Sequence, residues 1–195
     1  MSYNPKDHYF KKAKKENFVA RSIYKLEEID KKFNLIKKDH IIVDLGASPG
    51  SWSQYCLSKV GERGKVIGID LNPVTFKNPK YIFYQQDIFE VDWDLIKKER
   101  EIDKIDIVLS DMAPKTTGIK FTDQARSLDL CLKALEVSDL FLAAKGHFVC
   151  KFFHSDDYKV LANEMKKKFS QVEALKPDST RKISKEIFLI GINKK

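Results

Sequence analysis

Short apolar runs recur along this chain, and each is followed or preceded by a segment with helical periodicity. HIIVDL (40–45), KVIGID (65–70) and HFVCKFF (147–153) are rich in β-branched or aromatic residues and are mostly apolar throughout rather than alternating. Strands of this kind are buried on both faces, as in a parallel sheet. The pattern therefore predicts an α/β fold in which helices cover both faces of a mostly parallel sheet.

The expected elements follow from the same patterns. Strands are expected at 40–45, 65–70, 81–86, 104–110, 147–153, 170–175 and 186–192. Helices are expected at 18–34, 51–60, 91–100, 122–144 and 156–168. The loop between the last two strands is too short to hold a helix, so we expect these strands to be antiparallel.

Composition sets limits on the architecture. The 195 residues, 43% of them apolar, suffice for one core. We therefore expect a basic N-terminal extension over 1–17 and a single domain over 18–195. No run approaches the roughly 18 apolar residues of a membrane span. The three cysteines and four histidines show no paired or metal-binding spacing, which predicts no disulfide framework, no metal site and an intracellular location, cytoplasmic or, in a eukaryote, mitochondrial or otherwise organellar. A monomer is expected.

The charge balance favours a polyanionic partner. The formal net charge is +8, although a lysine-rich solvated surface is equally compatible with it. The candidate phosphate contacts are Lys11, Lys12, Lys14, Lys15, Arg21, Lys115, Lys120, Arg181, Lys182 and Lys185. Tyr9, Phe10 and Phe18 lie among the first of these cations. They suit stacking on unpaired bases, or packing of an N-terminal helix onto the domain.

The stretch VDLGASPGSWSQY (43–55) leads from the first strand into a helix. Ligands of open α/β sheets bind at this edge, where glycine permits close backbone approach. The spacing is G-x-x-x-G rather than the G-x-G-x-x-G of dinucleotide sites, and Asp44 before the turn suits a ligand with an ammonium group. Asp70 ends the next strand, where an acid can bind ribose hydroxyls, and Asp87 is placed to meet an adenine amino group. These features together predict S-adenosylmethionine as the cofactor.

Six blocks of sequence carry a resemblance to a known family. VDLGASPGSWSQY, GIDLNP, QQDIF, LSDMAPKTTG, FVCKFF and KPDSTRKISKEIFLIG occur in the order seen in the FtsJ/RrmJ family of ribosomal RNA ribose 2′-O-methyltransferases, which this chain resembles over about residues 5–193. The resemblance implies a Rossmann-like sheet of seven strands with the last one antiparallel, and methylation of a uridine in large-subunit ribosomal RNA. The candidate cofactor contacts are Asp44, Gly46, Ala47, Ser48, Pro49, Gly50, Trp52, Asp70, Leu71, Asp87, Ile88 and Asp111, of which Gly50, Trp52, Asp70, Asp87 and Asp111 follow from the resemblance.

Lys151 is the most informative candidate for chemistry. It stands inside an apolar run expected to be a central strand, where an unpaired ammonium would cost several kcal/mol. Asp111 ends the preceding strand and is its natural partner, although a strand-end lysine can also reach water and an acid can simply begin a turn. The resemblance adds Lys25 and Glu186 as catalytic positions. From the residues alone, both would be interpreted as surface charges.

The expected reaction is direct methyl transfer to a ribose 2′-hydroxyl. We expect Lys151 to orient or deprotonate the hydroxyl, with Asp111 and Glu186 fixing its geometry; the timing of proton removal stays open. Uracil C5 methylation needs a cysteine, but neighbouring Cys150 and Lys151 point to opposite faces of a strand. Adenine methylation would favour an Asn/Asp-Pro-Pro-aromatic loop by resemblance to those enzymes, and this chain has Asp-Met-Ala-Pro. The remaining alternatives are a tRNA ribose methyltransferase and an inactive RNA-binding assembly factor.

Overall fold

A computed structural model describes residues 8–115, 117–181 and 183–195, so the candidate RNA contact Lys182 lies outside the described residues. The helices are α1 (His8–Lys15), α2 (Ile23–Phe33), α3 (Ser51–Lys59), α4 (Trp93–Arg100), α5 (Lys120–Phe141) and α6 (Tyr158–Lys168). The strands are β1 (Ile41–Leu45), β2 (Lys65–Asp70), β3 (Tyr81–Gln85), β4 (Ile105–Ser110), β5 (Leu142–Phe153), β6 (Phe169–Leu175) and β7 (Glu186–Lys194).

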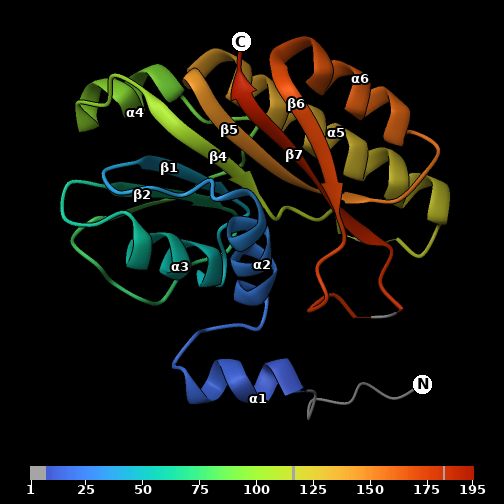
Figure 1. The fold of residues 1–195 in the computed structure, drawn as a ribbon, viewed down its shortest axis with the longest axis horizontal. Coiled ribbons are helices and arrows are strands. Elements are labelled where there is room, and N and C mark those ends of the chain that lie inside the picture. The colour runs from blue at the N-terminus through green and yellow to red at the C-terminus, as the bar shows by residue number, and fades with distance from the viewer. Residues whose placement is uncertain (1–7, 116, 182) are drawn as a thin grey trace.

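The strands form one sheet with the order β3-β2-β1-β4-β5-β7-β6 (Figure 1). Strands β1 to β5 pair in parallel, whereas β7 is antiparallel to both of its neighbours, β5 and β6. The expected α/β class, the seven strands of the described chain and the antiparallel last strand are therefore confirmed.

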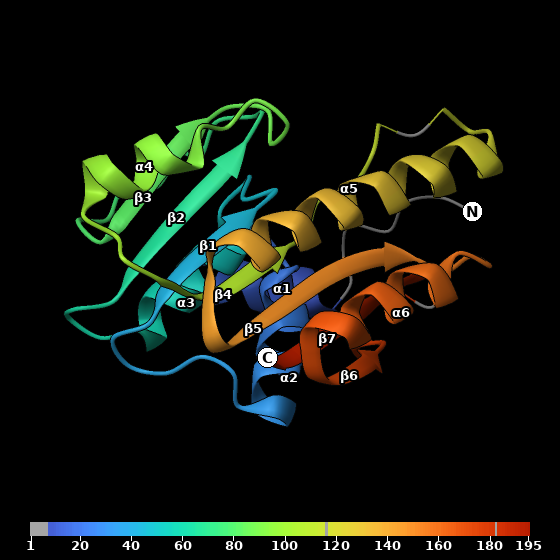
Figure 2. The same cartoon turned by 90° about the horizontal axis from the view of Figure 1, so that it is seen from above.

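Helices cover both faces of the sheet, as expected. In Figure 1, α4, α5 and α6 lie on one side and α2 and α3 on the other, and Figure 2 shows α5 running across the sheet. Each face has its own apolar core: Cys150 and Phe152 of β5 pack with α5 and α6, and Val149 packs with α2 and α3. This division follows from the alternation of side chains along a strand. Lys151 consequently lies on the side of α2 and α3.

Three element boundaries differ from the expected ones by three to five residues. The helix expected at 18–34 begins only at Ile23, after turns over the preceding residues, and ends where Asn34 adopts a left-handed conformation. The strand expected at 147–153 begins at Leu142, directly after α5. Its first part pairs irregularly with β4, and Lys145 has a φ of 65° there. The helix expected at 122–144 ends at Phe141 instead, so residues 142–144 belong to this strand. A positive φ at a non-glycine residue such as Lys145 cannot be read from periodicity.

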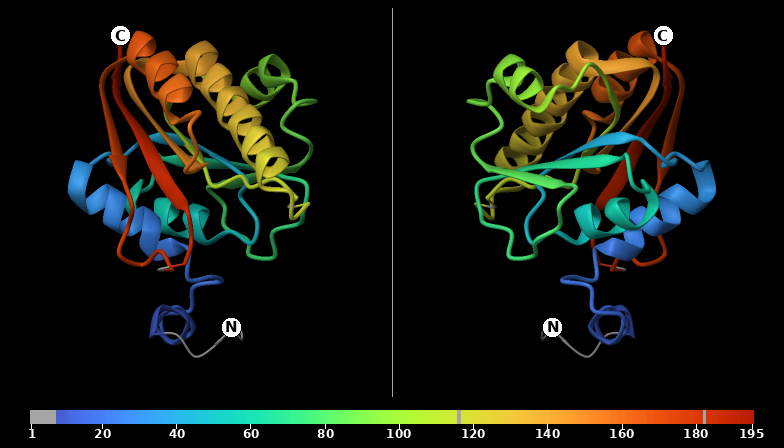
Figure 3. Two further views of the ribbon diagram at one scale, coloured as in Figure 1. Left: turned by 90° about the vertical axis from the view of Figure 1, so that its right-hand side faces the viewer. Right: turned by 90° about the vertical axis from the view of Figure 1, so that its left-hand side faces the viewer.

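The described part of the N-terminal extension contains α1, which lies beyond α2, away from the sheet, in both views of Figure 3. Ala13 is buried, and the ring centroid of Tyr9 lies 5.5 Å from that of Tyr24 in α2. Phe18 makes an edge contact with the same ring. Two of the three aromatic side chains therefore pack α1 and its connection onto α2. The division of the chain at residue 17 stays a prediction.

Candidate active site

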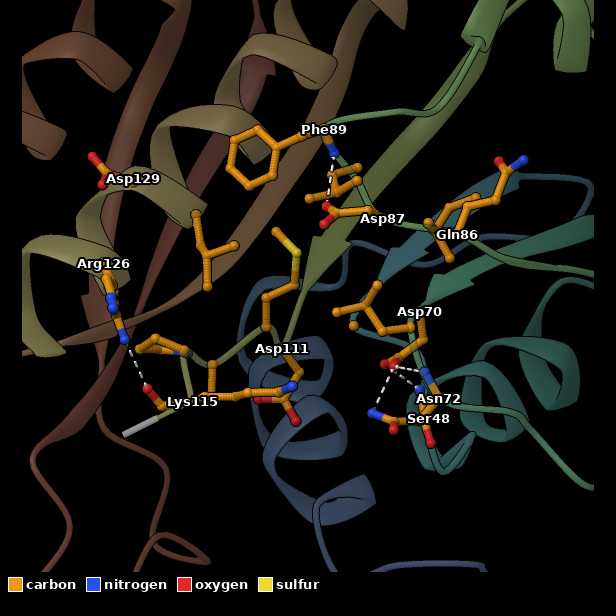
Figure 4. Close-up of a pocket in the computed structure, with 18 residues that line it drawn as sticks. Ser48, Asp70, Asn72, Gln86, Asp87, Phe89, Asp111, Lys115, Arg126 and Asp129 are labelled. Atoms are coloured by element: carbon orange, nitrogen blue, oxygen red, sulfur yellow. Dashed lines mark hydrogen bonds between the residues drawn. The ribbon is translucent and has the colours of Figure 1, made fainter. Parts of the chain in front are cut away.

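A cavity of about 640 Å³ opens at the carboxyl ends of the parallel strands (Figure 4). Its walls come from the segments that follow β1, β2, β3 and β4, together with one side of α5. This is the edge at which open α/β sheets bind ligands, and the volume suits a nucleoside-sized molecule. Seven of the candidate cofactor contacts line it: Gly46, Ser48, Asp70, Leu71, Asp87, Ile88 and Asp111.

The other five candidate cofactor contacts lie outside the wall of this cavity. Ala47 is buried behind the turn, Pro49 is exposed, and Gly50 precedes α3 with a φ of 112°. Trp52 is buried, and its indole N–H donates a hydrogen bond to the backbone oxygen of Ser22 at 2.9 Å. Asp44 is also buried. The direct contact of these five residues with a cofactor stays a prediction.

Two carboxylates at the cavity are held by backbone N–H groups. Asp70 accepts hydrogen bonds from the N–H of Ser48 at 2.9 Å and from that of Asn72 at 2.7 Å. Asp87 accepts one from the N–H of Phe89 at 3.1 Å. A carboxylate has about four lone-pair sites, so these bonds fix its orientation and leave capacity to accept from a ligand. Asp70 and Asp87 thus offer two fixed acceptors to hydroxyl or amino groups.

The turn after β1 and the segment after β4 meet at Gly46. Gly46 has a φ of 76°, and a Cβ atom there would lie 2.8 Å from the backbone nitrogen of Met112. The N–H of Asp111 donates to the backbone oxygen of Leu45 at 3.0 Å. Glycine is therefore required for this close approach, which brings Asp111 to the cavity wall.

Asp44 is a completely buried carboxyl group. The hydroxyl of Ser53 donates to its Oδ2 at 2.6 Å. Burial, followed by the nearby negative charges of Asp111 and Asp70, raises the pKa of Asp44 from 3.8 to about 7, although the Ser53 hydrogen bond acts in the opposite direction. Asp44 thus sits behind the cavity as a group that is partly protonated at neutral pH.

Lys151 and Asp111 form an ion pair at the edge of the cavity. The Nζ atom of Lys151 lies 2.8 Å from Oδ1 of Asp111 and donates a hydrogen bond to the backbone oxygen of the same residue at 2.5 Å. Lys151 is only 8% exposed. Strands β4 and β5 are neighbours with Ser110 opposite Cys150, so the residues that follow them meet. The partnership expected from the sequence is confirmed.

Lys25 and Glu186 form a second ion pair on the same side of the sheet. Their Nζ and Oε1 atoms are 2.5 Å apart, and the side chains are 12% and 14% exposed. Glu186 lies opposite Phe153 in the antiparallel register, and Phe188 lies opposite Lys151, so all four side chains share one face. The expectation that Glu186 fixes Lys151 is corrected: the ion pair of Glu186 is made with Lys25.

Cys150 faces away from this site. It is fully buried in the core beneath α5 and α6, and burial raises the pKa of its thiol well above 9.0. A buried, protonated thiol on the opposite face is no nucleophile for a ligand beside Lys151. The structure supports the exclusion of a cysteine-dependent uracil methylation.

Part of the cavity wall was not anticipated. Arg126, Asp129 and Leu130 of α5 line it, as do Asn72, Gln86 and Phe89 in the loops. The guanidinium of Arg126 also donates to the backbone oxygen of Lys115 at 3.5 Å. Asn72, Gln86 and Phe89 lie within two residues of the predicted acids Asp70 and Asp87, whereas the three residues of α5 have no such signal in the sequence. Only the packing of α5 over the loops reveals Arg126, Asp129 and Leu130 as part of the wall.

The surface around the site contains several of the candidate RNA contacts. Lys115 is exposed in the loop after β4, Lys120 is exposed at the start of α5, and Arg181 and Lys185 are exposed in the loop before β7. Arg21 instead donates a hydrogen bond to the backbone oxygen of Ser179. Within the described residues, no helix is long and apolar enough to cross a membrane, and no group of three or more His, Cys, Asp or Glu side chains could hold a metal ion.

Comparison with known proteins places this arrangement among methyltransferases. The model of a family described as FtsJ-like methyltransferase matches residues 18–194. The ribosomal RNA large subunit methyltransferase E of Bdellovibrio bacteriovorus is 60% identical over 196 residues and both chains are covered completely; the protein of that name from Oleidesulfovibrio alaskensis is 47% identical, with 96% of this chain and 91% of the other covered.

Two solved structures share the fold. A protein described as a ribosomal RNA methyltransferase from Plasmodium falciparum has a TM-score of 0.80 at 32% identity, over 91% of this chain and 98% of that one. A protein described as an rRNA-methylase from Clostridium thermocellum has a TM-score of 0.58 at 16% identity, over 89% of this chain and 97% of that one, and supports the fold alone.

Proposed function

Because this chain belongs to the FtsJ-like methyltransferase family, we propose that it methylates the 2′-hydroxyl of a uridine ribose in large-subunit ribosomal RNA, with S-adenosylmethionine as the cofactor. The observation that carries the proposal is the ion pair of Lys151 with Asp111, because it holds an almost buried amine against an acid that lines a cavity suited to an adenosine. The candidate catalytic residues are Lys25, Asp111, Lys151 and Glu186.

The residues of the cavity fit S-adenosylmethionine. Asp70 and Asp87 are oriented acceptors for ribose hydroxyls and an adenine amino group, and Ile88 and Leu71 offer apolar surface beside them. Gly46 keeps the floor of the turn open. When bound, this cofactor supplies a methyl group activated by a sulfonium.

The two ion pairs provide the polar groups that an RNA hydroxyl requires. Lys151 Nζ has one hydrogen bond to a carbonyl and one ion pair, which fix its direction. An ammonium has three donors, so one remains to orient the ribose oxygen. The ion pair of Lys25 and Glu186 lies on the same face of the sheet as Lys151. Glu186 or Asp111 can accept the proton that leaves the hydroxyl. Alignment of such groups accounts for a large part of the rate enhancement, up to about 7–11 kcal/mol of barrier.

The choice of ribosomal RNA rests on the relatives. The proteins that are 60% and 47% identical to this chain are named large-subunit ribosomal RNA methyltransferases, and they match it over nearly their full length. Both are bacterial, so we propose that the protein acts in the cytoplasm, where bacterial ribosomes are assembled. The exposed cations near the site are available to phosphates, and we expect RNA affinity to fall steeply with salt.

Methyl transfer to defined RNAs tests the proposal. Large ribosomal subunits from cells lacking the protein, protein-free ribosomal RNA and tRNA are each incubated with S-adenosylmethionine labelled in the methyl group. We expect label in the large subunit, at a ribose of a uridine, and a roughly 10²- to 10⁴-fold slower reaction for Lys151→Ala. Lys167→Ala, which removes an exposed lysine paired with Glu164, is the matched control and should react normally.

Each alternative result has a defined meaning. Label in tRNA alone would identify the protein as a tRNA ribose methyltransferase. Binding without any methyl transfer by the wild type would identify an RNA-binding assembly factor. Full activity of Lys151→Ala would remove Lys151 from the mechanism. If this variant is inactive, calorimetry shows whether it has lost its affinity for S-adenosylmethionine.

A further inference from the structure

A second, smaller cavity lies next to the candidate active site. It measures about 280 Å³ and is lined by Lys120, Asp123 and Gln124 at the start of α5, by Phe153 and His154 at the end of β5, and by Lys185 with Ser184 in the loop before β7. We refer to it as the flanking cavity. Figure 2 shows that the start of α5 and the end of β5 lie at the same end of the molecule.

The flanking cavity is connected to the catalytic residues by short stretches of chain. Lys185 directly precedes Glu186. Phe153 lies two residues beyond Lys151, or about 7 Å along an extended strand. The N–H of His154 donates to the backbone oxygen of Lys185 at 3.0 Å, which joins the two walls. The flanking cavity therefore lies within about one nucleotide's reach of a ribose placed at Lys151.

The chemistry of the walls combines apolar surface with opposite charges. Phe121 and Ile183 are the most exposed large apolar side chains of the described residues, at 81% each, and both adjoin residues that line the flanking cavity. Lys120 and Lys185 supply positive charge. Asp123 accepts hydrogen bonds from the N–H groups of Thr117 and Gly118, so its carboxylate is fixed in place. An exposed aromatic beside lysines is the combination that binds unpaired nucleotides.

We propose that the flanking cavity and Phe121 bind an unpaired RNA base of a nucleotide next to the methylated ribose, an inference that rests on the proposed function. The base stacks on the Phe121 ring, Lys120 and Lys185 contact the adjoining phosphates, and Asp123 and Gln124 offer hydrogen bonds to the base edge. A carboxylate in the wall disfavours a phosphate inside the cavity. The volume of about 280 Å³ lies just below the range of pockets for drug-sized ligands and leaves room for a base.

A tryptophan substitution reports on this contact without methyl transfer. Phe121→Trp places an indole at an exposed position, whereas the natural Trp52 and Trp93 are buried and contribute a constant background. Leu140→Trp is the matched control, because Leu140 is 64% exposed near the other end of the same helix. A short single-stranded oligoribonucleotide should quench Phe121→Trp with saturation and leave Leu140→Trp unchanged. An oligonucleotide with abasic sugars should bind roughly tenfold more weakly.

The outcomes separate this site from the proposed function. Three results would each overturn the proposed base-binding site: no quenching of Phe121→Trp, equal quenching of the two tryptophan variants, or equal affinity for the normal and the abasic strand. In methylation assays, Phe121→Ala should raise KM for RNA roughly tenfold with kcat retained, and Phe121→Trp should restore it; an unchanged KM would also contradict the proposal. Base-dependent quenching in a protein that methylates no RNA would leave the site standing and refute the methyltransferase proposal.

Discussion

Lys25 of α2 and Glu186, the first residue of β7, form an ion pair of 2.5 Å although they come from opposite ends of the sequence. Both side chains are nearly buried, so water cannot easily solvate the charge of one if its partner is removed. The ion pair joins α2 to β7, the antiparallel strand that pairs with the strand of Lys151. It is thus both a structural link and a part of the candidate active site.

Removing this pair should reveal energetic coupling. We expect Lys25→Met and Glu186→Gln each to lower kcat/KM for RNA by at least about tenfold, because each leaves a nearly buried charge unpaired. The double variant should be less impaired than the product of the two effects, with a coupling energy of roughly 1–3 kcal/mol. A double-mutant cycle measured on methyl transfer tests this. Strictly additive effects would show that the two residues act independently.

Glu28 of α2 should position the loop that leads to Glu186. Its carboxylate accepts hydrogen bonds from the N–H of Asp178 at 2.5 Å and from that of Ser179 at 3.0 Å. We expect Glu28→Ala to destabilise the fold by about 1–3 kcal/mol and to remove hydrogen-exchange protection from these two amides. It should also lower kcat/KM for RNA severalfold.

Glu27 provides the control for this experiment, because it precedes Glu28 on the same helix and its ion pair is local, with Lys31 at i+4. Glu27→Ala should leave the amides of the loop protected and the rate unchanged. Equal loss of protection in the two variants would argue for a general loosening of α2 rather than a specific clamp.

Gly46 should be intolerant of a side chain. Alanine there meets both the strain of a φ of 76° and the backbone of Met112 at 2.8 Å. We expect Gly46→Ala to lose roughly 3 kcal/mol or more of unfolding free energy and most of its affinity for S-adenosylmethionine. Gly118→Ala is the control: Gly118 also has a positive φ, of 82°, but a Cβ atom there would meet no other atom of the described residues within 4 Å. Gly118→Ala should lose only about 1–2 kcal/mol of unfolding free energy, from strain alone.

Urea unfolding measures the free energy of unfolding, and calorimetry measures the affinity for S-adenosylmethionine. Similar losses in the two glycine variants would mean that strain, rather than the close approach to Met112, dominates at Gly46. Unaltered cofactor affinity in Gly46→Ala would show that the contact between the two loops is unimportant for the cavity.

The buried carboxyl of Asp44 should make stability depend on pH. Its pKa is raised from 3.8 to about 7, first by burial and then by the charges of Asp111 and Asp70. The folded state therefore binds this proton more tightly than the unfolded state does. The resulting stabilisation is complete below about pH 4 and is lost as the pH rises from there through 7, on the order of 4 kcal/mol in total.

Comparison with Asp44→Asn isolates this contribution, because asparagine has a similar shape and does not titrate. The free energy of unfolding is measured in urea at several values between about pH 4 and pH 8 for both proteins. We expect the wild type to lose stability relative to the variant across this interval. A constant difference between the two proteins would mean that Asp44 has the same pKa in the folded and unfolded states.

Local patterns were sufficient to predict the sheet and one of the two ion pairs. Apolar runs such as those around Val43 and Val149 are buried on both faces wherever they occur, so their composition implies a central parallel sheet. A lysine inside such a run cannot be left alone, which led directly from Lys151 to an acid at the end of the neighbouring strand. The apolar burial of strands and the cost of a buried charge are both readable without coordinates.

Relationships between distant segments required the folded chain. No periodicity or spacing indicates that Lys25 meets Glu186, or that Arg126 of α5 lines the same cavity as Asp70. The long first part of β5 was likewise hidden, because an irregular pairing and a positive φ at Lys145 disrupt its pattern. Sequence periodicity records which residues avoid water. Which surfaces then meet depends on the packing of helices over the sheet, and that packing decided the shape of the cavity and the partners of its charges.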